Sequence, residues 1–143
     1  MTLNVSLSGL RGKDEVPYPA AIAAGVKLVM VSWAIYPALD RARPAGLSPT
    51  VVQSELRTRL GFQGVTITDA LEAGALTSFG TTAQRAVSAA QAGMDLILCS
   101  ARDVSQGETA TTGLVTALAG GQLEPTAFQA AVDRVSALRA SLF

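Results

Sequence analysis

The sequence of 143 residues contains no histidine and one cysteine, and both shortages narrow the chemistry that the chain can perform. Without histidine, zinc sites and the Ser-His-Asp arrangement of many hydrolases are excluded. A single cysteine excludes an internal disulfide and a multi-cysteine metal site. Because Cys99 lies in the apolar run Leu96–Cys99, we interpret it as a core thiol rather than a nucleophile. No metal or other cofactor is expected.

Charged residues are also few, at 15% of the chain, and the 11 basic and 11 acidic side chains balance. Such a chain is unsuited to nucleic acid or an anionic membrane surface, so neither is expected as a partner. No apolar run approaches the roughly 20 residues that cross a bilayer. The N-terminus lacks the basic start and apolar core of a secretion signal, so the sequence predicts a cytoplasmic protein. Glycine motifs for nucleotide binding are missing too.

Apolar residues are abundant, at 49%, which is enough for one domain with a real core over residues 1–143. One arrangement occurs three times: a helical pattern, a glycine, and a short apolar strand with a polar tip. The helices are expected at 18–24, 51–60 and 82–92, the glycines at 25, 61 and 93, and the strands at 26–32, 65–68 and 94–100. Nearly continuous apolar strands between helices indicate a parallel sheet covered on both faces, and so an α/β fold.

Two more helices are expected after the third strand, at 108–119 and 125–142. In the last of them, apolar side chains at helical spacing predict a packing stripe: Phe128, Val132, Val135 and Leu138. Two connections, 33–47 and 69–81, are longer than a tight turn. Both follow strand tips, so we expect them on the face where parallel α/β proteins bind ligands.

The segment Gly64–Glu72 carries the main functional signal. The β-branched strand Val65–Thr68 ends at Asp69, and parallel α/β folds present catalytic carboxylates at such strand tips. The residues alone leave two interpretations of Asp69 open: a carboxylate that caps nearby backbone amides, which is the commoner case, or a nucleophile or metal ligand in a central cleft. We interpret Glu72, three residues on, as a structural partner within the loop, and Asp95, at the start of its strand, as structural too.

Two motifs stand out in this chain: Val29–Asp40, which reads V-M-V-S-W-A-I-Y-P-A-L-D, and Gly61–Glu72, which reads G-F-Q-G-V-T-I-T-D-A-L-E. Both resemble glycoside hydrolase family 3, and within it the bacterial β-N-acetylhexosaminidases. The resemblance continues through Pro44–Pro49 and Ala90–Leu98, and so covers nearly the whole chain. It implies a partial (β/α)8 TIM barrel in which residues 1–143 supply about three parallel strands, the equivalents of strands six to eight, with flanking helices and a C-terminal helix.

The resemblance also implies a function. Asp69 matches the family nucleophile at the tip of strand seven, which attacks the anomeric carbon of a β-N-acetylhexosaminide and forms a glycosyl-enzyme that water then hydrolyses with retention. Ser32, Trp33 and Tyr36 are expected to contact the sugar. Trp33 stands where the family usually has histidine; it could stack on the sugar, and packing within the loop is the open alternative. A carbohydrate is therefore the expected partner, and peptidoglycan recycling the expected process.

Hydrolysis needs a second group, which protonates the leaving oxygen and later activates water. In similar family members this group is a histidine in the loop after strand five, and its motif K-H-F-P-G-H-G does not occur in this sequence. We therefore expect little or no hydrolysis by this chain alone. The alternative function is a non-catalytic partial barrel that self-associates or complements a separate chain, because open sheet edges favour association. A phosphoacceptor domain is disfavoured because Ser32 and Ser100 do not supply its acidic Mg²⁺ cluster.

Overall fold

The computed structural model describes residues 1–142, in which short helices surround a small sheet. The elements in chain order are α1 (Leu7–Gly9), η1 (Leu10–Asp14), α2 (Pro17–Ala23), β1 (Leu28–Val31), η2 (Ala45–Leu47), η3 (Thr50–Arg59), β2 (Val65–Thr68), η4 (Gly74–Leu76), α3 (Thr82–Ala92), α4 (Val104–Ala119) and α5 (Pro125–Ala140). Of the η elements, η2 and η4 are 3₁₀ turns, and η1 and η3 are wider than an α-helix.

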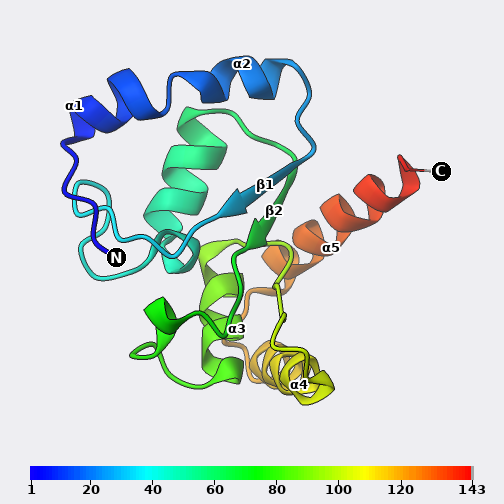
Figure 1. Cartoon of the computed structure of the whole chain (residues 1–143). Helices are drawn as coiled ribbons and strands as arrows, with labels where there is room; N and C mark the ends of the chain where they lie inside the picture. Colours follow the sequence, from blue (N-terminus) through cyan, green and yellow to red (C-terminus); the bar gives the residue numbers. More distant parts are fainter. Residues whose placement is uncertain (143) are drawn as a thin grey trace.

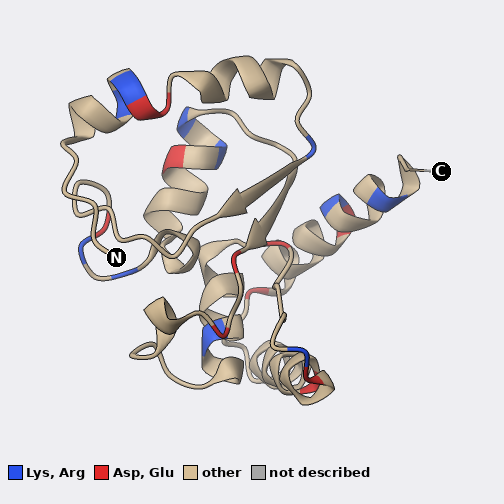
Figure 2. Ribbon diagram, in the orientation of Figure 1, with Lys and Arg blue, Asp and Glu red and all other residues tan. Residues whose placement is uncertain are grey.

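The sheet has two parallel strands, with Leu28 of β1 beside Val65 of β2 and Val31 beside Thr68. Helices α1 and α2 lie on the β1 side of this sheet, and α3, α4 and α5 lie on the β2 side (Figure 1). Acidic and basic residues are scattered over these elements rather than gathered on one of them (Figure 2). The expected mixed α/β fold with parallel strands between helices is confirmed.

The third expected strand, residues 94–100, is a correction to the sequence analysis. This segment meets β2 through one isolated parallel bridge, between Ile67 and Leu96, and the Thr68 N–H donates to the Leu96 carbonyl at 3.1 Å. One step further, the Leu98 N–H donates to the Thr68 hydroxyl at 2.9 Å instead of to a backbone carbonyl. The threonine side chain takes the place of the next backbone acceptor, so regular pairing stops after the bridge.

The helix boundaries follow their capping residues. The α3 boundaries are as predicted: the Thr81 hydroxyl accepts the Gln84 N–H, the Gln84 side chain returns to the Thr81 N–H, and Gly93 ends the helix at a φ of +97°. Helix α4 begins at Val104, four residues before its predicted start, because the Asp103 carboxylate accepts the N–H of the second helical residue.

The helix predicted at 51–60 has a wide last turn, in which the Leu60 N–H donates to the Glu55 carbonyl five residues back at 3.0 Å. The Glu55 carboxylate is buried and accepts two hydrogen bonds from Arg11, each of 2.8 Å. It also accepts one from Arg59 at 2.5 Å. The Arg11–Glu55 pair joins η1 to η3, and the Arg59–Glu55 pair lies within η3.

The core lies between the sheet and the helices on either side of it. Its largest fully buried side chains include Phe62, Leu71 and Leu76, of which the last two come from the connection after β2. Helices α3 and α4 approach closely, since a Cβ on Gly113 of α4 would lie 2.8 Å from the Cβ of Ala83. The connection that carries Asp69 is therefore anchored in the core rather than loose on the surface.

The last helix, α5, projects away from the rest of the fold (Figure 1). None of its residues is buried and Val132 is 42% exposed, so the packing stripe predicted for this helix is only partly covered. On β1, Leu28 and Met30 are also exposed, at 42% and 57%. No helix within residues 1–142 is long and apolar enough to cross a membrane.

Candidate active site

Asp69 follows β2 directly, at the carboxyl end of the sheet. Its N–H donates to the Val31 carbonyl at 3.2 Å, which extends the β1–β2 pairing to the residue that carries the carboxylate. Its Oδ1 accepts the Ala70 N–H at 2.7 Å, and the side chain is half-buried. Within residues 1–142 no group donates to its Oδ2. One carboxylate oxygen thus makes a local capping contact, and the other makes no hydrogen bond within the described residues.

The loop after β1 brings Ser32 and Trp33 to the same end of the sheet. Ser32 is exposed, and its hydroxyl accepts the Ala34 N–H of its own loop at 3.3 Å. Trp33 is only 3% exposed and donates its indole N–H to the Ala70 carbonyl at 2.8 Å. Tyr36, further along the loop, is half-buried against the core. The structure therefore brings Trp33 together with the segment after Asp69, and sugar contacts by these three side chains stay predictions.

A cavity of about 520 Å³ lies between β1, η3 and the N-terminal helices. Ser32 and Tyr36 line it, but neither Asp69 nor Trp33 does. Its other lining is largely apolar and includes Met30 and Leu56. The cavity is therefore separate from the Asp69 carboxylate at the strand tip.

Sequence reasoning missed the residues that hold the loop after Asp69. The Leu71 N–H donates to the Leu98 carbonyl at 3.0 Å, and Arg85 of α3 donates to the Leu71 carbonyl at 2.9 Å. A single arginine on a helix resembles a solvated surface charge, and a backbone carbonyl leaves no signal in a sequence. These contacts become visible only in the folded chain.

Glu72 joins this loop to the one after the third strand segment. Its carboxylate accepts the Ser100 hydroxyl at 2.5 Å and the Gln106 amide at 2.9 Å. The buried Gln106 also accepts the Ala101 N–H, at 3.0 Å. These hydrogen bonds, first that from Ser100 and then that from Gln106, lower the pKa of Glu72 to about 2. Glu72 is thus a structural partner of the neighbouring loop and not only of its own.

We expect this link to persist into strong acid. The pKa of Glu72 falls from 4.5 to about 2 on folding, so its ionised form stabilises the folded chain fully above pH 4.5 and loses that effect as the pH falls toward 2. A carboxyl-carbon NMR titration should place the Glu72 midpoint near the lower value. Ser100→Ala should raise that midpoint, because the serine hydroxyl is the main cause of the shift; an unchanged midpoint contradicts this assignment.

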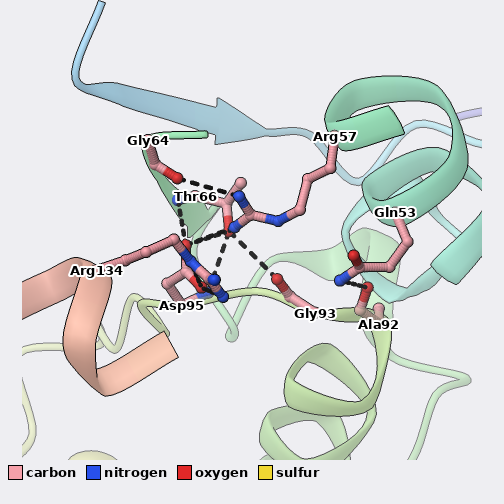
Figure 3. Close-up of polar contacts among 8 residues, drawn as sticks. All are labelled: Gln53, Arg57, Gly64, Thr66, Ala92, Gly93, Asp95 and Arg134. Atoms are coloured by element: carbon pink, nitrogen blue, oxygen red, sulfur yellow. Dashed lines mark hydrogen bonds and ion pairs between the residues drawn. The ribbon is translucent and has the colours of Figure 1, made fainter. Parts of the chain in front are cut away.

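Asp95 forms a buried ionic cluster near the start of β2. Its side chain is 0% exposed, and its Oδ2 accepts Arg57 at 2.6 Å and the Thr66 N–H at 2.8 Å. Its Oδ1 accepts the Arg134 guanidinium at 2.7 and 3.0 Å (Figure 3). Burial is the largest influence on Arg57 and lowers the pKa of its guanidinium. The cluster joins η3, β2 and α5, in line with the structural role predicted for Asp95.

Comparisons with known proteins show which protein family this chain is similar to. Residues 1–138 match the Glycosyl hydrolase family 3 N terminal domain. An uncharacterized secreted glycosyl hydrolase from Arthroderma benhamiae is 51% identical over 140 residues, which are 98% of this chain and 40% of that protein. A beta-hexosaminidase from Stenotrophomonas maltophilia is 41% identical over 93 residues, which are 65% of this chain and 28% of that protein.

Among solved structures, a glycoside hydrolase family 3 beta-N-acetylglucosaminidase from Paenibacillus superimposes with a TM-score of 0.93 at 34% identity. The match covers 97% of this chain and 26% of that one. The chain therefore spans less than half the length of these relatives. With the family domain matched over residues 1–138 and this likeness in structure, the resemblance inferred from the motifs is confirmed, and the chain belongs to glycosyl hydrolase family 3.

Proposed function

We propose that this chain forms the carboxyl-terminal part of a (β/α)8 catalytic barrel, and that Asp69 is its nucleophile in the retaining hydrolysis of β-N-acetylhexosaminides. The observation that supports this proposal is the position of the Asp69 carboxylate at the end of a parallel strand. One of its oxygens accepts the Ala70 N–H, and the other accepts no hydrogen bond from residues 1–142. An ionised carboxylate in this place can attack an anomeric carbon, and its charge faces the positive transition state.

The names of the relatives support the substrate class. One sequence relative is a beta-hexosaminidase and one structural relative a beta-N-acetylglucosaminidase, each considerably longer than this chain. The cytoplasmic location and the role in peptidoglycan recycling stay predictions from the sequence, and the relative from Arthroderma benhamiae is named as secreted.

The reaction divides into two steps with different needs. In the first, a carboxylate oxygen of Asp69 bonds to the anomeric carbon while the bond to the leaving group breaks, and an alkoxide leaving group must receive a proton. In the second, water attacks the same carbon and gives up a proton to a general base, while the bond from the carbon to Asp69 breaks and restores the carboxylate. The chain contains no histidine, so within these 143 residues no side chain matches the histidine that serves as acid/base in similar family members. Fluoride leaves without protonation, so a glycosyl fluoride isolates the first step.

This first step gives a direct test. We expect N-acetyl-β-glucosaminyl fluoride to add one N-acetylhexosaminyl group to the chain, and we expect digestion and mass spectrometry to locate it on the peptide that contains Asp69. The adduct should persist, since no general base speeds its hydrolysis. The α-anomer serves as the control and should leave the chain unmodified. An adduct on another carboxylate, or none from either anomer, would overturn the proposal.

Complete hydrolysis by this chain alone should be slow. Loss of general acid/base assistance lowers a rate by about 10²–10⁴-fold, and missing substrate contacts lower it further. The release of an aryl alcohol from an aryl β-N-acetylglucosaminide, followed by absorbance, measures this directly. Turnover close to that of a full-length family enzyme, and abolished by Asp69→Asn, contradicts the expectation.

A second candidate function is supported by the position of β1 at the edge of the two-stranded sheet. An unpaired strand edge favours pairing with another strand, and the exposed Leu28 and Met30 side chains, at 42% and 57%, add apolar surface beside it. The partner would be a protein segment that adds a parallel strand along β1, as a neighbouring strand does in a barrel. Native mass spectrometry of the chain at rising concentration tests whether a second copy fills this place. A monomer at every concentration argues against self-association and leaves a separate complementing chain as the partner to test.

A further inference from the structure

The peptide unit that joins Ala70 to Leu71 is held at both of its polar ends. Its carbonyl accepts the Trp33 indole N–H at 2.8 Å, and its N–H donates to the Leu98 carbonyl at 3.0 Å. Rotation of this unit would break both bonds at once. The preceding peptide unit, which joins Asp69 to Ala70, donates its N–H to the Asp69 carboxylate at 2.7 Å. Both peptide units meet at the Ala70 Cα, so a shift of Ala70 would move the donor that the carboxylate accepts.

Trp33 is itself fixed in place. Its side chain lies against Gly46, where an added Cβ would come within 2.5 Å of the indole Cζ3. The Gly46 N–H donates to the Ser32 carbonyl at 3.2 Å, so the backbone behind the ring is tied to the end of β1. With only 3% of the residue exposed, the indole N–H has one partner within residues 1–142, the Ala70 carbonyl.

We propose that Trp33 is a positioning residue for the nucleophile, acting through the Ala70 carbonyl, and this inference rests on the proposed function of Asp69. Through this hydrogen bond, the loop after β1 fixes the position of Ala70, the residue that follows Asp69. This role differs from sugar stacking, which would use the ring face and not the N–H. The two roles can therefore be separated by changing one atom.

The chain has a single tryptophan, so replacing tryptophan throughout with 3-benzothienylalanine alters only this side chain. That isostere carries sulfur in place of the indole N–H and keeps the size and face of the ring. We expect labelling of Asp69 by N-acetyl-β-glucosaminyl fluoride to slow by about 10–100-fold, the effect of a slight misplacement of a reacting group. The reagent concentration for half-maximal rate should not change. Stacking alone predicts no change in either quantity.

A second readout does not depend on catalysis. Loss of the Trp33 bond should speed amide hydrogen exchange at Leu71 by about two- to tenfold and shift the carboxyl-carbon resonance of Asp69. Exchange at Ile67 within β2 is the internal reference. If the natural chain is labelled and the isostere changes neither labelling nor exchange, the inference is overturned while the proposed function stands. If neither protein is labelled, the proposed function fails, and unchanged exchange and resonance overturn the inference as well.

Discussion

Asp69→Asn is expected to slow labelling by N-acetyl-β-glucosaminyl fluoride by a factor on the order of 10⁴–10⁶, as loss of a nucleophile does in well-characterised hydrolases. The amide has no charge and is a poor nucleophile, so it neither forms the glycosyl-enzyme bond nor stabilises the positive transition state. It is nearly the same shape, and its oxygen can still accept the Ala70 N–H that the carboxylate accepts at 2.7 Å. The adduct fraction over time, from intact-mass spectra, measures the rate.

Asp14→Asn provides the matched control for this variant. Asp14 is exposed at the end of η1, and the same change of carboxylate to amide there should leave the labelling rate unaltered. Circular dichroism of both variants checks that the fold is retained. Equal labelling of Asp69→Asn and the natural chain would exclude Asp69 as the nucleophile.

Asp95→Asn is expected to lower the free energy of unfolding by about 3–5 kcal/mol, the usual effect of removing one partner from a buried ion pair. Arg57 and Arg134 both bind this carboxylate, and their side chains are only 11% and 29% exposed. Without it, two guanidinium groups face each other with no counter-charge. Urea denaturation followed by circular dichroism gives the midpoint and the m-value of each protein, and their product is the free energy of unfolding.

The control for Asp95 lies on α5 itself. Asp133 is exposed and accepts an amide hydrogen bond from Gln129 at 2.8 Å, so Asp133→Asn should change the stability by no more than about 0.5 kcal/mol. Arg134→Gln should fall between the two, because Asp95 keeps its bond to Arg57. Equal losses for Asp95→Asn and Asp133→Asn would contradict a special role of the cluster.

Much of the fold follows from local signals in the sequence. The sequence places Gly25, Gly61 and Gly93 directly after the three expected helices, and all three adopt positive φ angles, of +83°, +77° and +97°. Such signals act within a few residues and need no tertiary partner. The apolar pattern predicts a full third strand at 94–100, which the structure does not have, because the Thr68 hydroxyl accepts the Leu98 N–H in place of a backbone carbonyl. The spacing of apolar residues cannot reveal that hydrogen bond.

At the site, too, features set by neighbouring residues could be predicted, and contacts between residues far apart in the sequence could not. The position of Asp69 at a strand tip was predictable, since strand and acid are adjacent in the chain. The bond from Trp33 to Ala70 spans 37 residues, and that from Gln106 to Glu72 spans 34. An indole or an amide in a loop or helix has many potential partners, and only the packing of the folded chain selects one. The family resemblance predicts Asp69 as the nucleophile, and it predicts none of these supporting contacts.

The way α5 is attached has a consequence for its release. This helix contributes no fully buried side chain, and the Arg134–Asp95 pair of 2.7 Å is its main polar link to the sheet. Undocking the helix would therefore separate Arg134 from a carboxylate that is 0% exposed and leave that carboxylate with one guanidinium partner fewer. Because salt screens buried and partly buried pairs much less than exposed ones, added salt alone should loosen α5 little. The C-terminal helix is thus an arm whose attachment depends on one largely buried ion pair.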